Sequence, residues 1–304
     1  MNTVALPDAA LALLTCPVCG TPLRRDERTM SCAAGHAFDL ARQGYLNLLP
    51  GRGPRSARAG DDRTMLASRR RFLDGGAYSA ISQSLNRLVL EHGFAGSAAS
   101  DTAGNSGATV TPPALLDAGC GEGYYLDGLR RSLPPERQVE ARLLGVDVSK
   151  HAVRMACGRS RDIAWVAASS AHLPVADASL DAIFCVFAPV FEQAFAEKLK
   201  PGGALIVVGP GPRHLFELKQ RVYDTPREFE PNHGPQLSAS RFAPIAREAV
   251  RLEVDLAGES IGDLLSMTPY TWSATREQQA RIHALASLRV TVDVVLTVFR
   301  RPGP

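Results

Sequence analysis

The sequence predicts an α/β protein of the Rossmann-like class, with a seven-stranded sheet and a small zinc-binding module at the N-terminus. Three observations predict it: cysteines cluster near the start, a glycine-rich turn follows a short apolar run, and apolar runs then alternate with helical stretches. Such alternation is typical of a parallel sheet covered by helices. We expect a zinc module (1–50), an Arg-rich linker with helices (51–92), a flexible insertion (93–113) and the sheet domain (114–304).

The composition is that of a globular protein. Its 304 residues suffice for about two average domains, and 45% of them are hydrophobic while 21% are charged. No apolar run reaches the roughly 18 residues that a membrane span needs, and no basic leader precedes the first apolar stretch. We therefore expect a cytoplasmic protein with no membrane partner. The net charge of +3 is too small to identify a partner by itself.

Four potential metal ligands lie near the start of the chain. Cys16 and Cys19 form a Cys-x-x-Cys pair, and Cys32 and His36 follow after twelve residues. Three sulfurs and one nitrogen are a typical ligand set for structural zinc, so we expect one zinc ion per chain. The polar stretch between the pairs fits a short hairpin, and because so small a module has almost no core, the metal should supply its folding free energy. Free thiols or a redox pair are the alternatives.

Two stretches of biased composition follow this module. From Arg52 to Arg71 there are seven Arg and two Asp, and from Asp62 onward the apolar spacing fits a helix with an Arg-rich face. This face is either a solvated surface or a strip that contacts RNA phosphates. The segment from Gly93 to Pro113 is rich in Gly, Ser, Ala and Thr, which predicts a flexible loop.

A glycine-rich turn gives the clearest chemical signal. Residues 114–117 form a short apolar run that ends in Asp117, and a helix is expected at 126–133. The turn between them contains Gly119, Cys120, Gly121, Glu122 and Gly123. A strand, a glycine turn and a helix form a nucleotide-binding unit. Glu122 disfavours a pyrophosphate at the helix N-terminus, whereas Asp117 can accept a hydrogen bond from a cationic amino group.

A second acidic residue lies near the end of the next expected strand. That strand spans 142–148 and contains Asp147, which is 24 residues past Gly123. A carboxylate there can accept hydrogen bonds from both hydroxyls of a ribose, and a surface turn residue is the alternative. An acidic pocket lined by glycine suits the positively charged S-adenosylmethionine better than it suits NAD.

The remaining chain keeps the alternating pattern. Further strands are expected at 163–167, 181–187, 204–208, 251–257 and 290–299, helices at 81–92, 191–199, 261–266 and 276–288, and a turn at 200–203. Ligands of open α/β sheets bind at the carboxyl ends of the strands, which would gather residues 169–172, 187–189 and 209–214 around one mouth. His172 and His214 in these loops are either ligand contacts or structural histidines.

Taken together, the motifs resemble one known family. CPVC-x12-C-x3-H, FDLARQGYLNLLP, LDAGCGEGYY, GVDVSK and PGPRHLFELK are similar to segments of the bacterial 23S rRNA guanine-N1 methyltransferases that modify the loop of hairpin 35. The resemblance covers nearly the whole chain. It implies a class I methyltransferase fold, S-adenosylmethionine as methyl donor, structural zinc on the four residues above, 23S rRNA as substrate, and a homodimer whose zinc modules help form the RNA cleft. It also implies cofactor contacts at Tyr78, Cys120, Gly121, Glu122, Asp147 and His214.

The same resemblance implies the chemistry. The GCGEGYY form is similar to the housekeeping branch, whereas a related branch methylates a neighbouring guanine and gives macrolide resistance. Guanine N1 would attack the sulfonium methyl group, with positioning supplying most of the acceleration. No residue stands out as the base, so no catalytic residue is assigned. Phe187, Tyr270 and Trp272 are candidates for stacking on a nucleobase, with core packing as the alternative.

Two other functions stay open at the level of sequence. The first is a methyltransferase of a small molecule, in which the zinc module would serve dimerisation. The second is a non-catalytic zinc protein that binds RNA and retains a decayed cofactor fold. Transfer of a labelled methyl group to rRNA, and binding of S-adenosylmethionine, would separate these functions from the first.

Overall fold

The structure is a computed structural model that describes residues 7–49, 63–94, 112–135, 141–230 and 236–303. Most of the expected insertion at 93–113, and the first part of the Arg-rich stretch, therefore lie outside the described residues. None of the described helices is long and apolar enough to cross a membrane.

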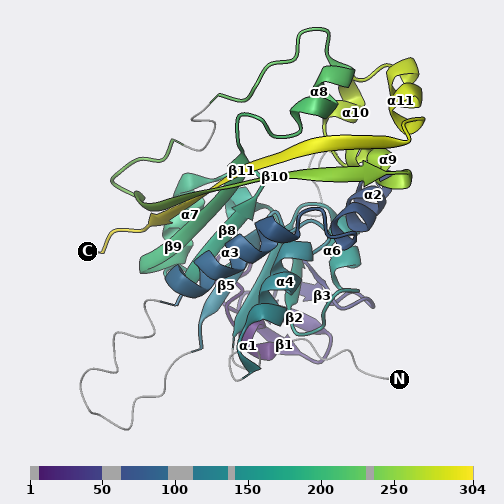
Figure 1. Ribbon diagram of the computed structural model, residues 1–304. Helices are drawn as coiled ribbons and strands as arrows, with labels where there is room; N and C mark the ends of the chain where they lie inside the picture. The colour runs from purple at the N-terminus through teal and green to yellow at the C-terminus, as the bar shows by residue number, and fades with distance from the viewer. Residues whose placement is uncertain (1–6, 50–62, 95–111, 136–140, 231–235, 304) are drawn as a thin grey trace.

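One large sheet forms the body of the protein. Its strands in chain order are β4 (Leu46–Asn47), β5 (Ala114–Ala118), β6 (Arg142–Asp147), β7 (Ala164–Ala167), β8 (Leu180–Val186), β9 (Leu199–Pro210), β10 (Ala243–Ala257) and β11 (Ser287–Arg300). Their spatial order is β10-β11-β9-β8-β5-β6-β7-β4. Strands β4 to β9 are parallel, and β11 is antiparallel to both of its neighbours. Figure 1 shows β10 and β11 as a long ribbon that extends beyond the parallel part.

The expectation of seven strands is correct for the sheet domain itself, but the whole sheet has eight. The additional strand, β4, comes from the predicted zinc module and pairs with β7, Leu46 opposite Val166. A two-residue strand is too short to give an alternating pattern, so the sequence did not predict it. Its pairing covers backbone groups at what would otherwise be the edge of the sheet.

Helices cover both faces of this sheet. After α1 (Asp8–Leu11) they are α2 (Arg63–Asp74), α3 (Ser79–His92), α4 (Tyr124–Ser132), α6 (Lys150–Ala156), a 3-10 turn η1 (Ser170–His172), α7 (Glu192–Lys198), α8 (Phe216–Val222), α9 (Glu259–Ser266), α10 (Tyr270–Ser273) and α11 (Arg276–His283). The expectation of a helix at 276–288 was wrong after His283, because Ser287 already pairs with Ala257 in the antiparallel ladder. The expected turn at 200–203 lies within β9, where Gly202 has φ of 76°.

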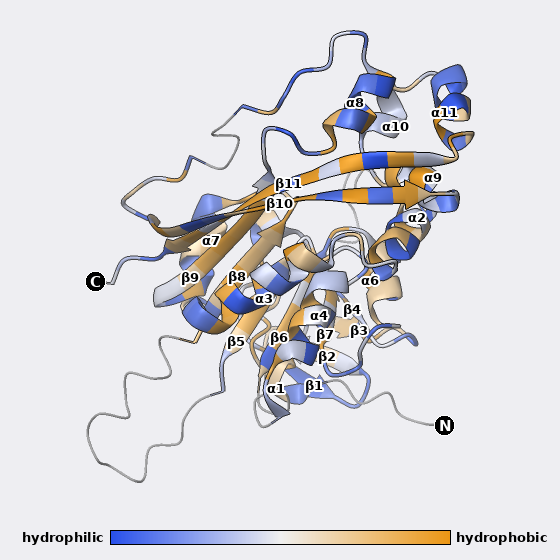
Figure 2. Cartoon of the chain, in the orientation of Figure 1, coloured by the Kyte–Doolittle hydropathy of each residue, from blue (hydrophilic) through white to orange (hydrophobic). Residues whose placement is uncertain are grey.

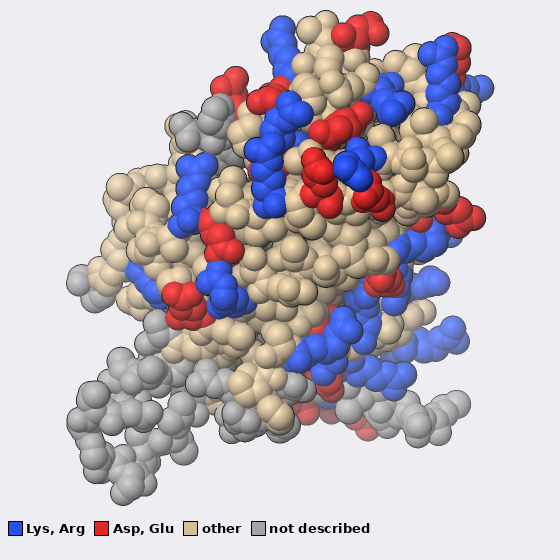
Figure 3. All heavy atoms as spheres, viewed as in Figure 1, with Lys and Arg blue, Asp and Glu red and all other residues tan. Residues whose placement is uncertain are grey.

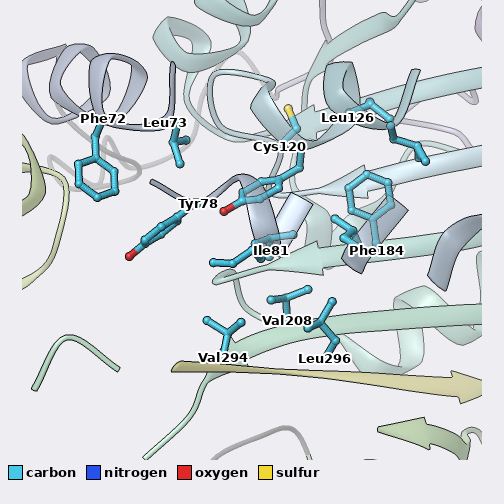
Figure 4. Close-up of a cluster of buried hydrophobic side chains, with 14 of the residues drawn as sticks. Phe72, Leu73, Tyr78, Ile81, Cys120, Leu126, Phe184, Val208, Val294 and Leu296 are labelled. Atoms are coloured by element: carbon cyan, nitrogen blue, oxygen red, sulfur yellow. The ribbon is translucent and has the colours of Figure 1, made fainter. Parts of the chain in front are cut away.

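The parallel strands are buried on both faces, which explains their continuous apolar sequences. In β5, Leu115 packs in the core beneath α3 and α4, while the next residue, Leu116, packs in the core on the opposite face. Adjacent residues of a strand point to opposite faces, so both must be apolar here. Figure 2 shows β8 and β9 as largely hydrophobic, and Figure 4 shows Ile81, Leu126 and Phe184 packed in the core of the first face.

The zinc module forms a three-stranded sheet, β1 (Leu23–Asp26), β2 (Thr29–Cys32) and β3 (Ala37–Asp39), and the expected hairpin is its first pair. The expectation that this module has almost no core was wrong. Leu14 forms a bridge with Val175, and Leu23 and Met30 belong to the same apolar cluster as the second face of the large sheet. The module is therefore stabilised by packing on the main domain as well as by its metal.

Candidate functional site

The four predicted zinc ligands lie together. The ligand atoms of Cys16, Cys19, Cys32 and His36 are all within 4.8 Å of one another. The Sγ atoms of Cys19 and Cys32 are 3.7 Å apart, and Nδ1 of His36 lies 3.6 Å from Cys16 Sγ and 3.4 Å from Cys32 Sγ. Tetrahedral zinc, with Zn–S near 2.3 Å and Zn–N near 2.0–2.1 Å, places ligand atoms roughly 3.6–3.8 Å apart. The geometry therefore fits one zinc ion held by three thiolates and one imidazole.

Two tight turns bring these ligands together. The Gly20 N–H donates to the Cys16 carbonyl at 2.8 Å, and the Gly35 N–H donates to the Cys32 carbonyl at 3.0 Å. Gly20 and Gly35 have φ of 73° and 84°, a region that glycine adopts without strain. Each turn thus folds a ligand pair back on itself and brings its two ligand atoms to one side.

The glycine-rich turn lies at the carboxyl ends of β5 and β6. The Gly121 N–H donates to Asp147 Oδ2 at 2.9 Å, and the Ser149 N–H donates to Asp147 Oδ1 at 2.8 Å. Gly119, with φ of 84°, lies where an added Cβ would be 2.6 Å from the Cβ of Ala188. The turn therefore has a fixed shape in which the Asp147 carboxylate is held by two backbone donors.

Asp117 is a buried carboxylate with an unusual environment. It is 1% exposed, and its Oδ2 has no hydrogen-bond partner among the described residues. Burial, helped by the negative charge of Asp147, raises its pKa well above the usual range. A buried carboxylate without a partner is costly unless a ligand supplies one. Asp117 lines neither of the two cavities at this end of the sheet, so its carboxylate lies behind the glycine turn and acts on a ligand there through its charge.

Not every predicted turn residue faces this site. Glu122 is buried and directs Oε2 to Nε of Arg159 at 2.5 Å, and Arg159 also forms an ion pair with Asp74 of α2 at 2.8 Å. Cys120 belongs to the apolar core. Glu122 and Cys120 therefore hold the turn in place from behind, and their side chains line neither of the two cavities at this end of the sheet.

Gly145 of β6 makes room for the indole of Trp165, on which the turn rests. An added Cβ at Gly145 would lie 2.4 Å from the Trp165 ring, and one at Gly123 would lie 2.7 Å from it. Because Trp165 is 1% exposed and cannot move aside, Gly145→Ala is expected to lower the free energy of unfolding by about 1–3 kcal/mol. Urea unfolding measures the change, with Gly303→Ala, which meets no atom within 4 Å, as control. An unchanged free energy in Gly145→Ala would contradict this packing.

Two cavities meet at the carboxyl end of β8. The first, of about 330 Å³, is lined by Gly119, Gly121 and Asp147 together with Ser169 and Ser170. The second, of about 900 Å³, is lined mainly by aromatic and apolar side chains, includes Tyr78 and His214, and also contains Arg69 and Glu230. The two cavities share the side chains of Arg69, Phe187, Ala188 and Pro189. The structure thus brings Gly119, Gly121 and Asp147 together but places Tyr78 and His214 in the neighbouring cavity. Asp117 and Gly123, which were also predicted to bind the cofactor, line neither cavity.

Sequence reasoning missed Arg69, which lines both cavities. It lies on α2 within the Arg-rich stretch, and nothing in its local sequence distinguishes it from Arg70 and Arg71. Arg71 instead binds Asp263 of α9 through two hydrogen bonds. His172, in contrast, lies in η1 and lines neither cavity.

Three features occur together in this chain. They are a Rossmann-like sheet with acidic residues near the ends of two adjacent strands, a glycine turn between those strands, and a Cys3His zinc site. Together they define a zinc-containing, S-adenosylmethionine-dependent methyltransferase. Residues 14–57 match the zinc-ribbon family described as "RlmA, N-terminal", and residues 115–203 match the family described as "Methyltransferase domain". The solved geranyl diphosphate C-methyltransferase of Streptomyces coelicolor A3(2) is 14% identical, with a TM-score of 0.40 over 72% of this chain and 76% of that chain.

Curated relatives are similar over almost the full length. The 23S rRNA (guanine(748)-N(1))-methyltransferase of Streptomyces fradiae is 34% identical over 94% of this chain and 96% of its own. Two further relatives are provisionally named as 23S rRNA (guanine-N(1)-)-methyltransferases. The one from Micromonospora griseorubida is 34% identical over 94% of this chain and 97% of its own. The one from Bacillus subtilis is 29% identical over 94% of this chain and 96% of its own. The chain belongs to the family of 23S rRNA (guanine-N1)-methyltransferases.

Proposed function

We propose that this protein transfers a methyl group from S-adenosylmethionine to N1 of a guanine in the hairpin 35 loop of 23S rRNA. The observation that carries the proposal is the pair of cavities that meet at Phe187, one lined by glycine and by the Asp147 carboxylate, the other lined mainly by aromatic and apolar side chains. Such a pair suits a cationic methyl donor beside a planar nucleobase. A ribosomal RNA substrate implies that the protein acts in the cytoplasm.

In this proposal the methyl donor occupies the smaller cavity. Asp147 accepts hydrogen bonds from the ribose, and Gly119 and Gly121, which have no side chain, let the donor lie close to the backbone of the turn. Asp117, buried behind this turn, adds negative charge that favours a cationic donor. The bound donor supplies an electrophilic methyl carbon. The chain contributes by holding that carbon in line with the acceptor and by excluding water, which can account for roughly 7–11 kcal/mol of the activation barrier.

The zinc module is proposed to bind RNA, with Cys16, Cys19, Cys32 and His36 holding its metal. The homodimer that the resemblance implies is part of the same proposal, because two modules would then border one RNA cleft. Size-exclusion chromatography with light scattering measures the dimer directly.

The modified nucleotide decides between two versions of this function. The sequence-based preference is the housekeeping guanine, but the relative from Streptomyces fradiae is named for guanine 748, which supports the neighbouring site as the second candidate. Methylation of N1 blocks Watson–Crick pairing, so primer extension on rRNA from cells with and without the gene should stop one nucleotide before the target. A stop in hairpin 35 that depends on the gene supports the proposal and identifies the guanine, and the absence of any such stop contradicts it.

A basic surface beside the donor cavity is expected to contact RNA phosphates. It consists of Arg63, Lys150, Arg154 and Arg161, which are all exposed and form no ion pair with another described residue. Figure 3 shows Lys and Arg gathered on this side of the molecule, over α4 and α6. Burial and the charges of Arg63 and Arg154 lower the pKa of the neighbouring His151, which agrees with a positive local potential.

Removing this charge should make RNA binding less sensitive to salt. On single strands each phosphate contact contributes roughly 0.7 to the slope of log affinity against log salt concentration. The triple variant Lys150→Ala, Arg154→Ala, Arg161→Ala removes three such contacts and is therefore expected to reduce the magnitude of this slope by about 2. The measurement is fluorescence anisotropy of a labelled hairpin 35 RNA from low to high salt. Arg281→Ala, at an arginine of α11 that pairs with Glu277, is the control and should leave the slope unchanged. An unchanged slope in the triple variant would place the RNA elsewhere.

A further inference from the structure

Arg69 lies where the two cavities meet and has no role in the chemistry described so far. It lines the smaller cavity, which is the proposed site of the methyl donor, and it also lines the larger one. Among the described residues that line either cavity, Arg69 is the only lysine or arginine. A single positive side chain at such a junction suits a negatively charged group of a ligand. A role for Arg69 in holding the donor rests on the proposed function and deepens it.

The helix that carries Arg69 is held in place by ion pairs to two other parts of the chain. Arg71 donates two hydrogen bonds to the carboxylate of Asp263 in α9, at 3.0 and 2.5 Å. Asp74, the last residue of α2, pairs with Arg159 at 2.8 Å, and Arg159 also holds the glycine-rich turn. Because α2 cannot shift relative to the turn without breaking these pairs, the position of Arg69 is set by long-range contacts.

The guanidinium group of Arg69 lies beside the glycine-rich turn. A Cβ added at Gly121 would be 3.9 Å from both Nε and Cζ of Arg69. Burial raises the pKa of Asp117, of Tyr78 and of Tyr125, and the positive charge of Arg69 opposes this rise at all three. The charge of Arg69 therefore acts on the turn that lines the smaller cavity and on the tyrosines that line the larger one.

The methyl donor carries one group that suits an arginine. Its sulfonium and its amino group are positive, and its carboxylate is negative. Asp147 in the smaller cavity and Asp117 behind the turn favour the positive groups, but both repel the carboxylate. A guanidinium presents two parallel N–H donors that match the two oxygens of a carboxylate. Arg69 is thus the complementary partner for the one negative group of the donor.

We propose that Arg69 binds the carboxylate of the methionine part of S-adenosylmethionine and so fixes that part of the donor at the junction of the two cavities. Asp147 holds the ribose, so the donor is held on both sides of its sulfonium. Restricting the donor in this way reduces the freedom that methyl transfer would otherwise have to remove. Tyr78 and His214, which the resemblance implies are cofactor contacts, line the larger cavity together with Arg69 and agree with a donor that extends to this junction.

The test removes each partner of this pair in turn. Calorimetry measures the binding of S-adenosylmethionine, and of decarboxylated S-adenosylmethionine, to the wild type and to Arg69→Ala. Loss of a hydrogen-bonded charge pair is expected to weaken the binding of S-adenosylmethionine about 10- to 100-fold. The binding of the decarboxylated analogue should not weaken, because the pair is already absent. S-adenosylhomocysteine, which keeps the carboxylate, should lose affinity by the same factor as S-adenosylmethionine.

Two further variants separate charge, geometry and position. Arg69→Lys keeps the positive charge but loses the parallel donors, so its loss of affinity for S-adenosylmethionine should be smaller than that of Arg69→Ala. Arg70→Ala is the matched control, because Arg70 is the next residue of the same helix, lines neither cavity and pairs with Asp74. It should bind both ligands as the wild type does.

Three other outcomes have distinct meanings. If Arg69→Ala weakens the binding of S-adenosylmethionine and of its decarboxylated analogue equally, Arg69 only supports the shape of the site, and the inference is overturned. If the binding of both ligands is unchanged while the affinity for a hairpin 35 RNA falls, Arg69 contacts the RNA, and the inference is again overturned. If the wild type methylates no guanine of 23S rRNA but the ligands bind as expected, the proposed function fails and the carboxylate pair stands.

Discussion

Asp117→Asn is expected to make the donor-free protein more stable while weakening its binding of S-adenosylmethionine. Burial raises the pKa of Asp117, so the native state binds a proton more readily than the unfolded state does. The stability that this proton gives is present near pH 4 and is lost as the pH rises through the raised pKa. At pH 8 the neutral amide should therefore raise the free energy of unfolding by about 1–3 kcal/mol, and near pH 4 the two proteins should be equally stable.

Donor binding should change in the opposite direction. Loss of a buried negative charge directly behind the donor cavity is expected to weaken donor affinity about 10-fold, measured by calorimetry at pH 8. Asp127→Asn is the matched control, because Asp127 is also buried but pairs with Arg130 and Arg131 on α4. That variant should be less stable and should bind the donor normally. Equal donor affinity in Asp117→Asn and the wild type would show that the charge of Asp117 does not contribute to donor binding.

Loss of zinc is expected to unfold the module without unfolding the sheet domain. Cys19→Ser replaces the one exposed cysteine of the ligand cluster, and zinc content should fall from one equivalent per chain to near zero after dialysis. Structural zinc contributes roughly 10–16 kcal/mol of binding free energy at neutral pH, more than packing of Leu23 and Met30 on the sheet can replace. Hydrogen exchange in residues 7–49 should increase strongly, and methylation of rRNA should be lost.

The donor site serves as the internal reference for that experiment. Because Asp117 and Asp147 lie on strands of the main domain, calorimetry should find donor affinity unchanged in Cys19→Ser. Cys157→Ser, at a cysteine outside the ligand cluster, is the control and should retain one equivalent of zinc. Unchanged hydrogen exchange in Cys19→Ser would mean that packing alone holds the module together.

Local patterns were sufficient to predict most elements and both cofactors. The apolar runs of β5 and β8 and the glycine turn define a nucleotide-binding unit within a few residues of chain, and the zinc ligands are encoded by the spacing of two short turns. The most important error concerned the module, where spacing gave no sign that Leu14 and Met30 pack on the large sheet. Periodicity shows that a residue is buried but does not show what buries it.

The sequence by itself determined the class of fold, the zinc ligands and the acidic, glycine-lined turn, because these depend on residues close together in the chain. Only the tertiary structure decided that Tyr78 lies beside His214, 136 residues later, that Glu122 turns back onto Arg159, and that Arg69 borders both cavities. Each of these depends on how α2, α3 and the late strands pack against the parallel sheet. Long-range packing of this kind arises from the combined shape of many side chains and leaves no local signal in a single sequence.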